Sequence, residues 1–105
     1  MKYKIIRTDK ADALIRRIIL FVAENFGEDV ALEKLNDLET SFLPLEDNPY
    51  IGTRPRYSIL SRQGFLVLIL EKDLVFYKVD DKEKIVTIYA VVDQRQDYLS
   101  IVLGL

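Results

Sequence analysis

The side chains with the clearest chemical potential lie near the C-terminus, where Arg95 stands between Asp93 and Asp97 and Tyr98 follows. The chain contains no cysteine and no histidine, which excludes thiol nucleophiles, serine–histidine triads and the usual zinc sites. Acid or base catalysis would depend on Asp, Glu, Lys or Tyr, with arginine as the fixed positive charge. Taken alone, Arg95 and its acidic neighbours also fit a surface ion-pair cluster at the exit of a strand, and Tyr98 fits a packing role.

A second set of cations, Arg54, Arg56 and Arg62, lies around a predicted strand in the middle of the chain. Arginine carries a planar fork of donors that suits phosphate or carboxylate groups. The set therefore predicts a contact surface for a nucleic acid or a protein target. The same arginines would also serve as solubilising charges that protect an edge strand.

Charge is distributed unevenly, although the net charge is only −2. Residues 1–23 carry six basic and two acidic side chains, whereas residues 24–50 carry one basic and eight acidic side chains. This division indicates one basic and one acidic surface, and the acidic balance weighs against non-specific binding to nucleic acid. No apolar run approaches the roughly 20 residues of a membrane span. We expect a soluble cytoplasmic protein that uses neither a metal ion nor a cofactor.

The first half of the chain predicts one strand and two helices. Residues 2–7 are typical of a short strand, and apolar residues then recur every three or four positions up to Phe26, which predicts a helix that begins near Thr8 or Asp9. Gly27 should end this helix. A second amphipathic helix is expected from Glu28 or Asp29 to residue 42 or 43, just before Pro44.

The second half predicts strands over residues 57–60, 65–70, 74–79 and 85–92, separated by short polar turns. Such turns require antiparallel neighbours, because parallel strands need longer connections. The predicted order is β-α-α-β-β-β-β, in a single domain over residues 1–105. The fold class is therefore α+β, with a helix hairpin packed on a twisted, mainly antiparallel sheet.

Several short motifs occur along the chain in a fixed order. They are Tyr3 to Arg7 followed by Ala11, then Phe26-Gly27 followed by Ala31, then Leu45, Pro49 and Gly52, then Gly64-Phe65, then Tyr77-Lys78-Val79-Asp80, and finally Arg95-Gln96-Asp97. Their order and spacing resemble the RelE/ParE superfamily of bacterial toxins, which are the toxic halves of type II toxin–antitoxin modules. The resemblance covers nearly the whole chain.

The resemblance implies a toxin that inhibits growth, belongs to a plasmid-stabilisation type of module and is neutralised by a cognate antitoxin. RelE-like members cut messenger RNA on the ribosome with basic side chains on the second and third strands and with an arginine and an aromatic or histidine near the C-terminus. ParE-like members bind DNA gyrase and lack this set. When the chain is matched at Gly64, the basic strand positions fall on Tyr57, Ile59 and Leu66, and none of them is basic.

Site residues follow from the resemblance. Arg95 matches the C-terminal arginine of the ribonucleases and Tyr98 is the candidate terminal aromatic, so these two are the candidate catalytic residues. Antitoxin binding is expected at the apolar tail, which also fits a segment that folds back onto the core. The tail residues assigned to antitoxin binding are Leu99, Ile101, Val102 and Leu103.

Three functions remain open at this point. The sequence favours a ParE-like toxin that binds a target such as DNA gyrase, because the basic strand positions are lost. A RelE-like ribosome-dependent mRNA endonuclease built around Arg95 is the first alternative. A non-toxic relic that still binds an antitoxin is the second, and each of the three predicts a possible hetero-oligomer with the antitoxin.

Overall fold

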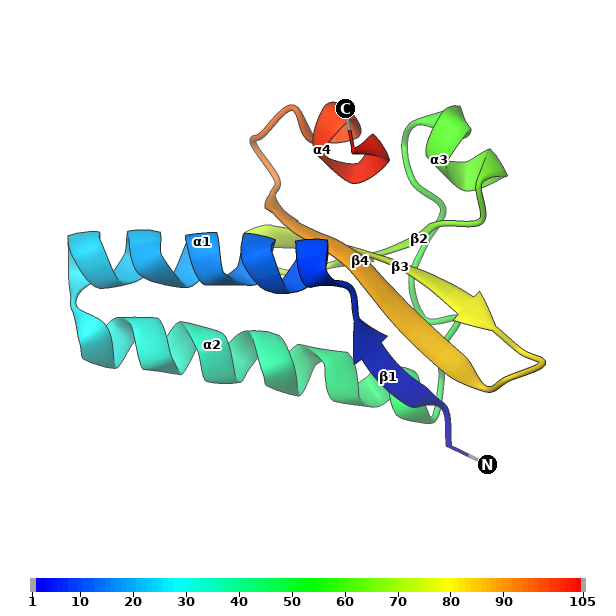
Figure 1. Cartoon of the computed structure of the whole chain (residues 1–105), viewed down its shortest axis with the longest axis horizontal. Coiled ribbons are helices and arrows are strands. Elements are labelled where there is room, and N and C mark those ends of the chain that lie inside the picture. Colours follow the sequence, from blue (N-terminus) through cyan, green and yellow to red (C-terminus); the bar gives the residue numbers. More distant parts are fainter. Residues whose placement is uncertain (1, 105) are drawn as a thin grey trace.

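The structure, a computed structural model, describes residues 2–104 and arranges them as a helix hairpin beside a curved sheet, with two short helices on the sheet's other face (Figure 1). The N-terminal half contains β1 (Lys4–Arg7), α1 (Asp9–Phe26), α2 (Glu28–Phe42) and the short 3₁₀ helix η1 (Leu43–Glu46). The C-terminal half contains α3 (Ser58–Arg62), β2 (Leu66–Ile69), β3 (Asp73–Asp80), β4 (Ile85–Asp93) and α4 (Tyr98–Leu103). No helix in residues 2–104 is long and apolar enough to cross a membrane.

The sheet has the strand order β1-β4-β3-β2. The strands β2, β3 and β4 form an antiparallel meander, and β1 joins β4 in parallel. The parallel pairing is possible because β1 and β4 are far apart in the chain, with the helix hairpin, α3, β2 and β3 between them. A register shift between Phe76 and Tyr77 bends β3 against β4. The predicted fold class is confirmed, with a helix hairpin on a mainly antiparallel sheet.

The hairpin forms because both helices carry the start and stop signals that the sequence predicted. Thr8 caps α1, and its Oγ1 accepts a hydrogen bond from the amide of Ala11 at 3.0 Å. Gly27 ends α1 with φ of 95°, a conformation that strains residues with a side chain. A single residue therefore separates α1 from α2, and the two helices pack side by side.

Two hydrophobic clusters lie on opposite faces of the sheet. Successive residues of a strand point to opposite faces, so Val75 and Tyr77 belong to the cluster beneath α1 and α2, whereas Leu74 and Phe76 belong to the cluster beneath α3 and α4. The first cluster also holds Ala11, Ile15, Leu38, Phe42, Leu45, Val86, Ile88 and Val91. The second also holds Leu60, Phe65, Val67, Ala90, Val92, Tyr98 and Val102.

The predicted strand over residues 57–60 is wrong, because the chain forms the helix α3 from Ser58 to Arg62 there. The place beside β2 is taken by Thr53, which exchanges two hydrogen bonds with Val67. A short apolar run does not distinguish a strand from a helical turn, and Leu60 reaches full burial from a helix as well as from a strand. Gly64, with φ of 90°, then redirects the chain into β2.

Candidate functional site

Arg95 lies in the segment between β4 and α4, and Asp93 fixes its orientation. The Asp93 carboxylate accepts hydrogen bonds from the Arg95 backbone amide at 2.8 Å and from its guanidinium Nε at 3.2 Å. These bonds lower the pKa of Asp93 below its ordinary range. The Arg95 side chain is still 90% exposed, so it presents its charge to solvent. The predicted cluster of Arg95 with Asp93 is present in the structure, but Asp97 takes no part in the ion pair.

Tyr98 begins α4 and is only 8% exposed. Its ring lies against Phe76, with centroids 5.2 Å apart, and it meets the ring of Tyr57 edge-on at 5.5 Å. Arg95 and Tyr98 are close in sequence, yet one faces solvent and the other packs in the cluster beneath α3 and α4. The structure therefore gives the two candidate catalytic residues different surroundings.

Two of the candidate contact arginines, Arg54 and Arg56, lie in the connection between η1 and α3. We call this connection, residues 47–57, the arginine loop. Arg62 lies beyond it, in α3. Arg54 and Arg56 are exposed on either side of the buried Pro55. The Arg56 guanidinium lies 5.2 Å from the centre of the Tyr57 ring and hydrogen-bonds its hydroxyl at 3.2 Å. Arg62 is exposed at the end of α3. Among residues 2–104, none of these three arginines forms a salt bridge.

The candidate antitoxin-binding residues all belong to α4. Val102 is buried with Tyr98, whereas Leu99, Ile101 and Leu103 are partly buried around the same cluster. Lys10 of α1 hydrogen-bonds the carbonyl of Ile101, which places a positive charge at the C-terminal end of α4, where the helix dipole favours it. The tail therefore folds back onto the sheet and keeps part of its apolar surface at the edge.

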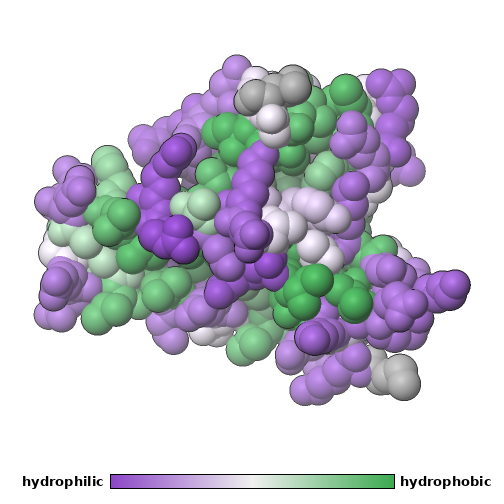
Figure 2. All heavy atoms as spheres, in the orientation of Figure 1, coloured by the Kyte–Doolittle hydropathy of each residue, from purple (hydrophilic) through white to green (hydrophobic). Residues whose placement is uncertain are grey.

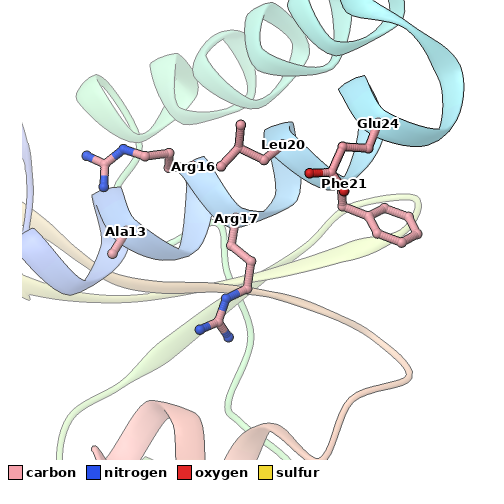
Figure 3. Close-up of a pocket in the computed structure, with 6 residues that line it drawn as sticks. All are labelled: Ala13, Arg16, Arg17, Leu20, Phe21 and Glu24. Carbon is pink, nitrogen blue, oxygen red and sulfur yellow. The ribbon is translucent and has the colours of Figure 1, made fainter.

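An exposed apolar patch on α1 is not among the sites that the sequence motifs predicted. Leu20 is 55% exposed and Phe21 is 61% exposed, and they border a shallow hollow of about 380 Å³ together with Arg16, Arg17, Ala13 and Glu24. Figure 3 shows the guanidinium groups of Arg16 and Arg17 pointing away from each other on this side of the helix. Figure 2 shows hydrophobic areas over the helix hairpin between hydrophilic side chains. The sequence does indicate that these side chains are exposed, because Leu20 and Phe21 fall outside the stripe of α1 that the three-to-four-residue spacing predicts to be buried.

Lys78 is a further cation that the sequence analysis did not assign to the site, because the basic positions implied by the resemblance fall on other residues. It lies on β3, with its Nζ 4.5 Å from the centre of the Phe65 ring and 5.1 Å from that of Tyr89. The structure thus supplies a strand-borne cation that is held by aromatic rings. By contrast, Tyr57 immediately precedes α3 and Ile59 lies within it. Leu66 packs against the cluster beneath α1 and α2.

Comparisons with known proteins identify the family. The chain matches the family described as "ParE toxin of type II toxin-antitoxin system, parDE" over residues 5–98. No curated protein matches the chain significantly.

Three solved structures are similar in fold. A chain of the chromosomal ParDE toxin–antitoxin system from P. aeruginosa is 21% identical, with a TM-score of 0.73 over 87% of this chain and 95% of that one. A chain of the RelBE2 toxin–antitoxin complex from Mycobacterium tuberculosis is 17% identical, with a TM-score of 0.63 over 90% and 100%. A mutant of the E. coli toxin RelE in the free state is 17% identical, with a TM-score of 0.64 over 99% and 93%. Since the family match takes in the hairpin, nearly the whole sheet and the first residue of α4, the chain belongs to the ParE toxins of type II toxin–antitoxin systems, within the RelE/ParE superfamily.

Proposed function

We propose that this toxin acts by binding a protein target, in the ParE-like manner, and that the target is DNA gyrase. The observation that carries the proposal is that the two candidate catalytic residues, Arg95 and Tyr98, have different surroundings. Arg95 is exposed and held by Asp93, while Tyr98 is buried between aromatic rings. Cleavage of a phosphodiester needs an acid, a base and several cations around one phosphate, and these two side chains do not form such a set.

The arginine loop and Arg62 are the proposed contact with the target. Their three arginines are exposed and lack carboxylate partners among residues 2–104. An unpaired arginine can form bidentate hydrogen bonds with carboxylates of a partner without first breaking an internal ion pair. An acidic patch on the target would supply those carboxylates.

Neutralisation is proposed to occur at α4. Two of the similar structures come from ParDE and RelBE2 toxin–antitoxin assemblies, which supports an antitoxin partner for this chain and a hetero-oligomer with it. Leu99, Ile101 and Leu103 keep part of their apolar surface exposed above the buried Val102. An apolar face of an antitoxin segment would cover that surface. A cytoplasmic location is part of the same proposal, because the proposed target lies there.

Induction in a bacterial host tests the proposal. We expect growth arrest, and we expect the purified toxin to inhibit gyrase supercoiling in proportion to its concentration. The variant Arg54→Ala/Arg56→Ala should lose most of this inhibition, whereas Lys82→Ala/Lys84→Ala, which removes two positive charges from the turn between β3 and β4, should retain it. If cells that contain folded protein grow normally, both toxic functions are rejected and the non-toxic, antitoxin-binding relic is the function that stands. Toxicity without any effect on gyrase would reject the target.

A RelE-like mRNA endonuclease is the second candidate, and Lys78 favours it. This lysine supplies a cation on the third strand, close to Phe65 and Tyr89, and Arg95 supplies a second cation near the C-terminus. Primer extension on transcripts after induction separates the candidates. New 5′ ends within translated codons would support the endonuclease, and intact transcripts during growth arrest would support the binding toxin.

A further inference from the structure

The arginine loop has almost no regular secondary structure, yet its backbone is tied to the sheet at several points. Pro49 and Pro55 are buried, and Thr53 pairs with Val67 at the edge of β2 through hydrogen bonds of 2.8 and 2.9 Å. A flexible loop would lose conformational freedom on binding a partner, and that loss weakens affinity. A loop that is already fixed avoids this loss.

The central attachment is the hydroxyl of Tyr77. The side chain of Tyr77 lies in β3 and is fully buried. Its Oη donates a hydrogen bond to the carbonyl of Pro49 at 2.7 Å and accepts one from the amide of Gly52 at 3.0 Å. Burial raises the pKa of Tyr77 above its ordinary value, so the hydroxyl stays protonated and can serve as donor and acceptor at neutral pH.

Gly52 is shaped to receive this hydroxyl. A Cβ atom at position 52 would lie 2.5 Å from the Tyr77 Oη and 2.8 Å from the carbonyl oxygen of Val67. Both distances are too short for any carbon, and one of the two obstacles is backbone. The close approach that lets the Gly52 amide reach the hydroxyl therefore requires glycine.

The attachment lies directly before the cations. Arg54 follows Gly52 by two residues, and Arg56 lies beyond the buried Pro55 with its guanidinium beside the ring of Tyr57. Tyr57 in turn meets Tyr98. One end of the short segment that bears Arg54 and Arg56 is therefore fixed by the buried Tyr77, and the other by the partly buried Tyr57, while Arg54 and Arg56 remain exposed.

We infer that the Tyr77 hydroxyl and Gly52 form a latch that holds Arg54 and Arg56 in the arrangement that a carboxylate surface of the target recognises. The inference rests on the proposed function, in which these arginines contact a protein target. Tyr77 is a positioning residue here, because it is buried and acts only through the loop.

Three variants test the latch, with gyrase inhibition and amide hydrogen exchange as readouts. Tyr77→Phe removes the hydroxyl and keeps the buried ring, and Gly52→Ala blocks the approach. Tyr89→Phe is the matched control, because it removes a tyrosine hydroxyl that has no hydrogen-bond partner within residues 2–104. We expect Tyr77→Phe to accelerate exchange of the Gly52 amide and to raise the concentration for half-inhibition about tenfold, which corresponds to losing one or two hydrogen bonds. Tyr89→Phe should change neither.

A double-mutant comparison distinguishes positioning from general destabilisation. If Tyr77 acts through the arginines, Tyr77→Phe should cause no further loss in a protein that already carries Arg54→Ala/Arg56→Ala. A further loss of similar size in that background would overturn the latch, and so would an unchanged half-inhibition concentration in a folded Tyr77→Phe protein. Antitoxin affinity should stay within about twofold for every folded variant, because α4 lies outside the loop; a general loss would indicate a merely structural role.

The exchange measurement needs no target and so separates failure of the latch from failure of the proposed function. If wild-type protein leaves gyrase unaffected, the target is wrong, and slow exchange of the Gly52 amide that becomes fast in Tyr77→Phe would still support the latch. If that amide remains protected in Tyr77→Phe, the latch is overturned whatever the target. Adding polyglutamate or nucleic acid as a competitor tests the carboxylate surface as the ligand. If nucleic acid relieves the inhibition of gyrase and polyglutamate does not, the carboxylate surface is overturned.

Discussion

Asp81, in the turn after β3, accepts hydrogen bonds from two tyrosines that come from distant parts of the chain. Tyr3 donates at 2.6 Å and Tyr50 of the arginine loop donates to the other carboxylate oxygen. The bond to Asp81 raises the pKa of Tyr50 to about 12. The bonds from Tyr3 and Tyr50 lower the pKa of Asp81. The cluster therefore requires protonated tyrosines and an ionised aspartate.

We expect the stability from this cluster to be confined between two pH limits. Because the folded pKa of Tyr50 is raised, its contribution is present below the unfolded value near 10 and is lost as pH rises to about 12. Because the folded pKa of Asp81 is lowered, its contribution is present above the unfolded value near 4 and is lost as pH falls through the folded value. Alkaline titration of tyrosinate absorbance should show a step near pH 12 that loses the amplitude of one tyrosine in Tyr50→Phe and shifts toward 10 in Asp81→Asn. The buried Tyr77, whose pKa is also raised, should titrate late in both variants. An unchanged amplitude near pH 12 in Tyr50→Phe would contradict the assignment to Tyr50.

Arg95 lies at the surface after β4. Its ion pair with Asp93 is strongly exposed, so Arg95→Ala should leave the free energy of unfolding almost unchanged. Urea denaturation measures this, with Lys82→Ala as an exposed-charge control. Growth after induction then tests the role of the side chain, because lost toxicity at unchanged stability would assign Arg95 to the target contact or to catalysis. Retained toxicity would leave it as a surface ion pair.

The helix hairpin is attached to the sheet by a buried polar contact as well as by apolar packing. Lys34 of α2 forms a salt bridge with Asp73 at the start of β3, and the Asp73 side chain is only 5% exposed. Asp73 stands opposite Asp93 in the register of β3 and β4, so Lys34 also reduces repulsion between two carboxylates. This contact joins residues 39 positions apart, and it fixes the orientation of α2 above the strands.

Breaking this contact should destabilise the fold more than replacing it. Asp73→Ala leaves the Lys34 ammonium partly buried without a partner, and we expect it to lower the free energy of unfolding by about 3 kcal/mol. Lys34→Met/Asp73→Leu replaces both charges by apolar groups of similar size and should recover most of that loss. Urea denaturation of the two variants provides the comparison. Equal losses in both would show that the charge pair itself is the source of stability.

On the scale of the whole molecule, charge is separated between surfaces. The acidic residues of positions 24–50 lie largely on α2 and η1, whereas Arg54, Arg56 and Arg62 lie in a stretch of the chain without acidic residues between positions 48 and 70. A net charge of −2 is therefore compatible with the proposed binding of an acidic target through the arginine loop. Binding of this kind depends on local potential and not on net charge.

Salt should weaken target binding through this surface. Raising the ionic strength from about 0.05 to 0.5 M shortens the screening length several-fold, so the affinity of wild-type protein should fall about tenfold. The variant Arg54→Ala/Arg56→Ala should show a flatter salt dependence, whereas Lys82→Ala/Lys84→Ala should keep the wild-type slope. Titration of gyrase by calorimetry at several salt concentrations measures these slopes. An equal slope in all three proteins would place the contact elsewhere.

Much of the fold could be predicted because its signals are local. The recurrence of apolar residues up to Phe26, the cap at Thr8 and the stop at Gly27 are each readable within a few positions, and α1 begins and ends where they indicate. The meander of the last three strands follows from their short turns. Residues 57–60 carry no comparable local signal, and there the predicted strand was replaced by α3.

The family, the order of most elements and the residue types available for chemistry can be read from the amino-acid sequence, because motifs and periodicity are properties of neighbouring positions. Which of those residues meet depends on the tertiary structure. It separated Arg95 from Tyr98, joined Lys34 to Asp73, and brought the Tyr77 hydroxyl to the Gly52 amide. Each of these outcomes depends on strand register and on the close approach of distant backbone segments, and a one-residue change of register would turn every side chain of a strand to the opposite face.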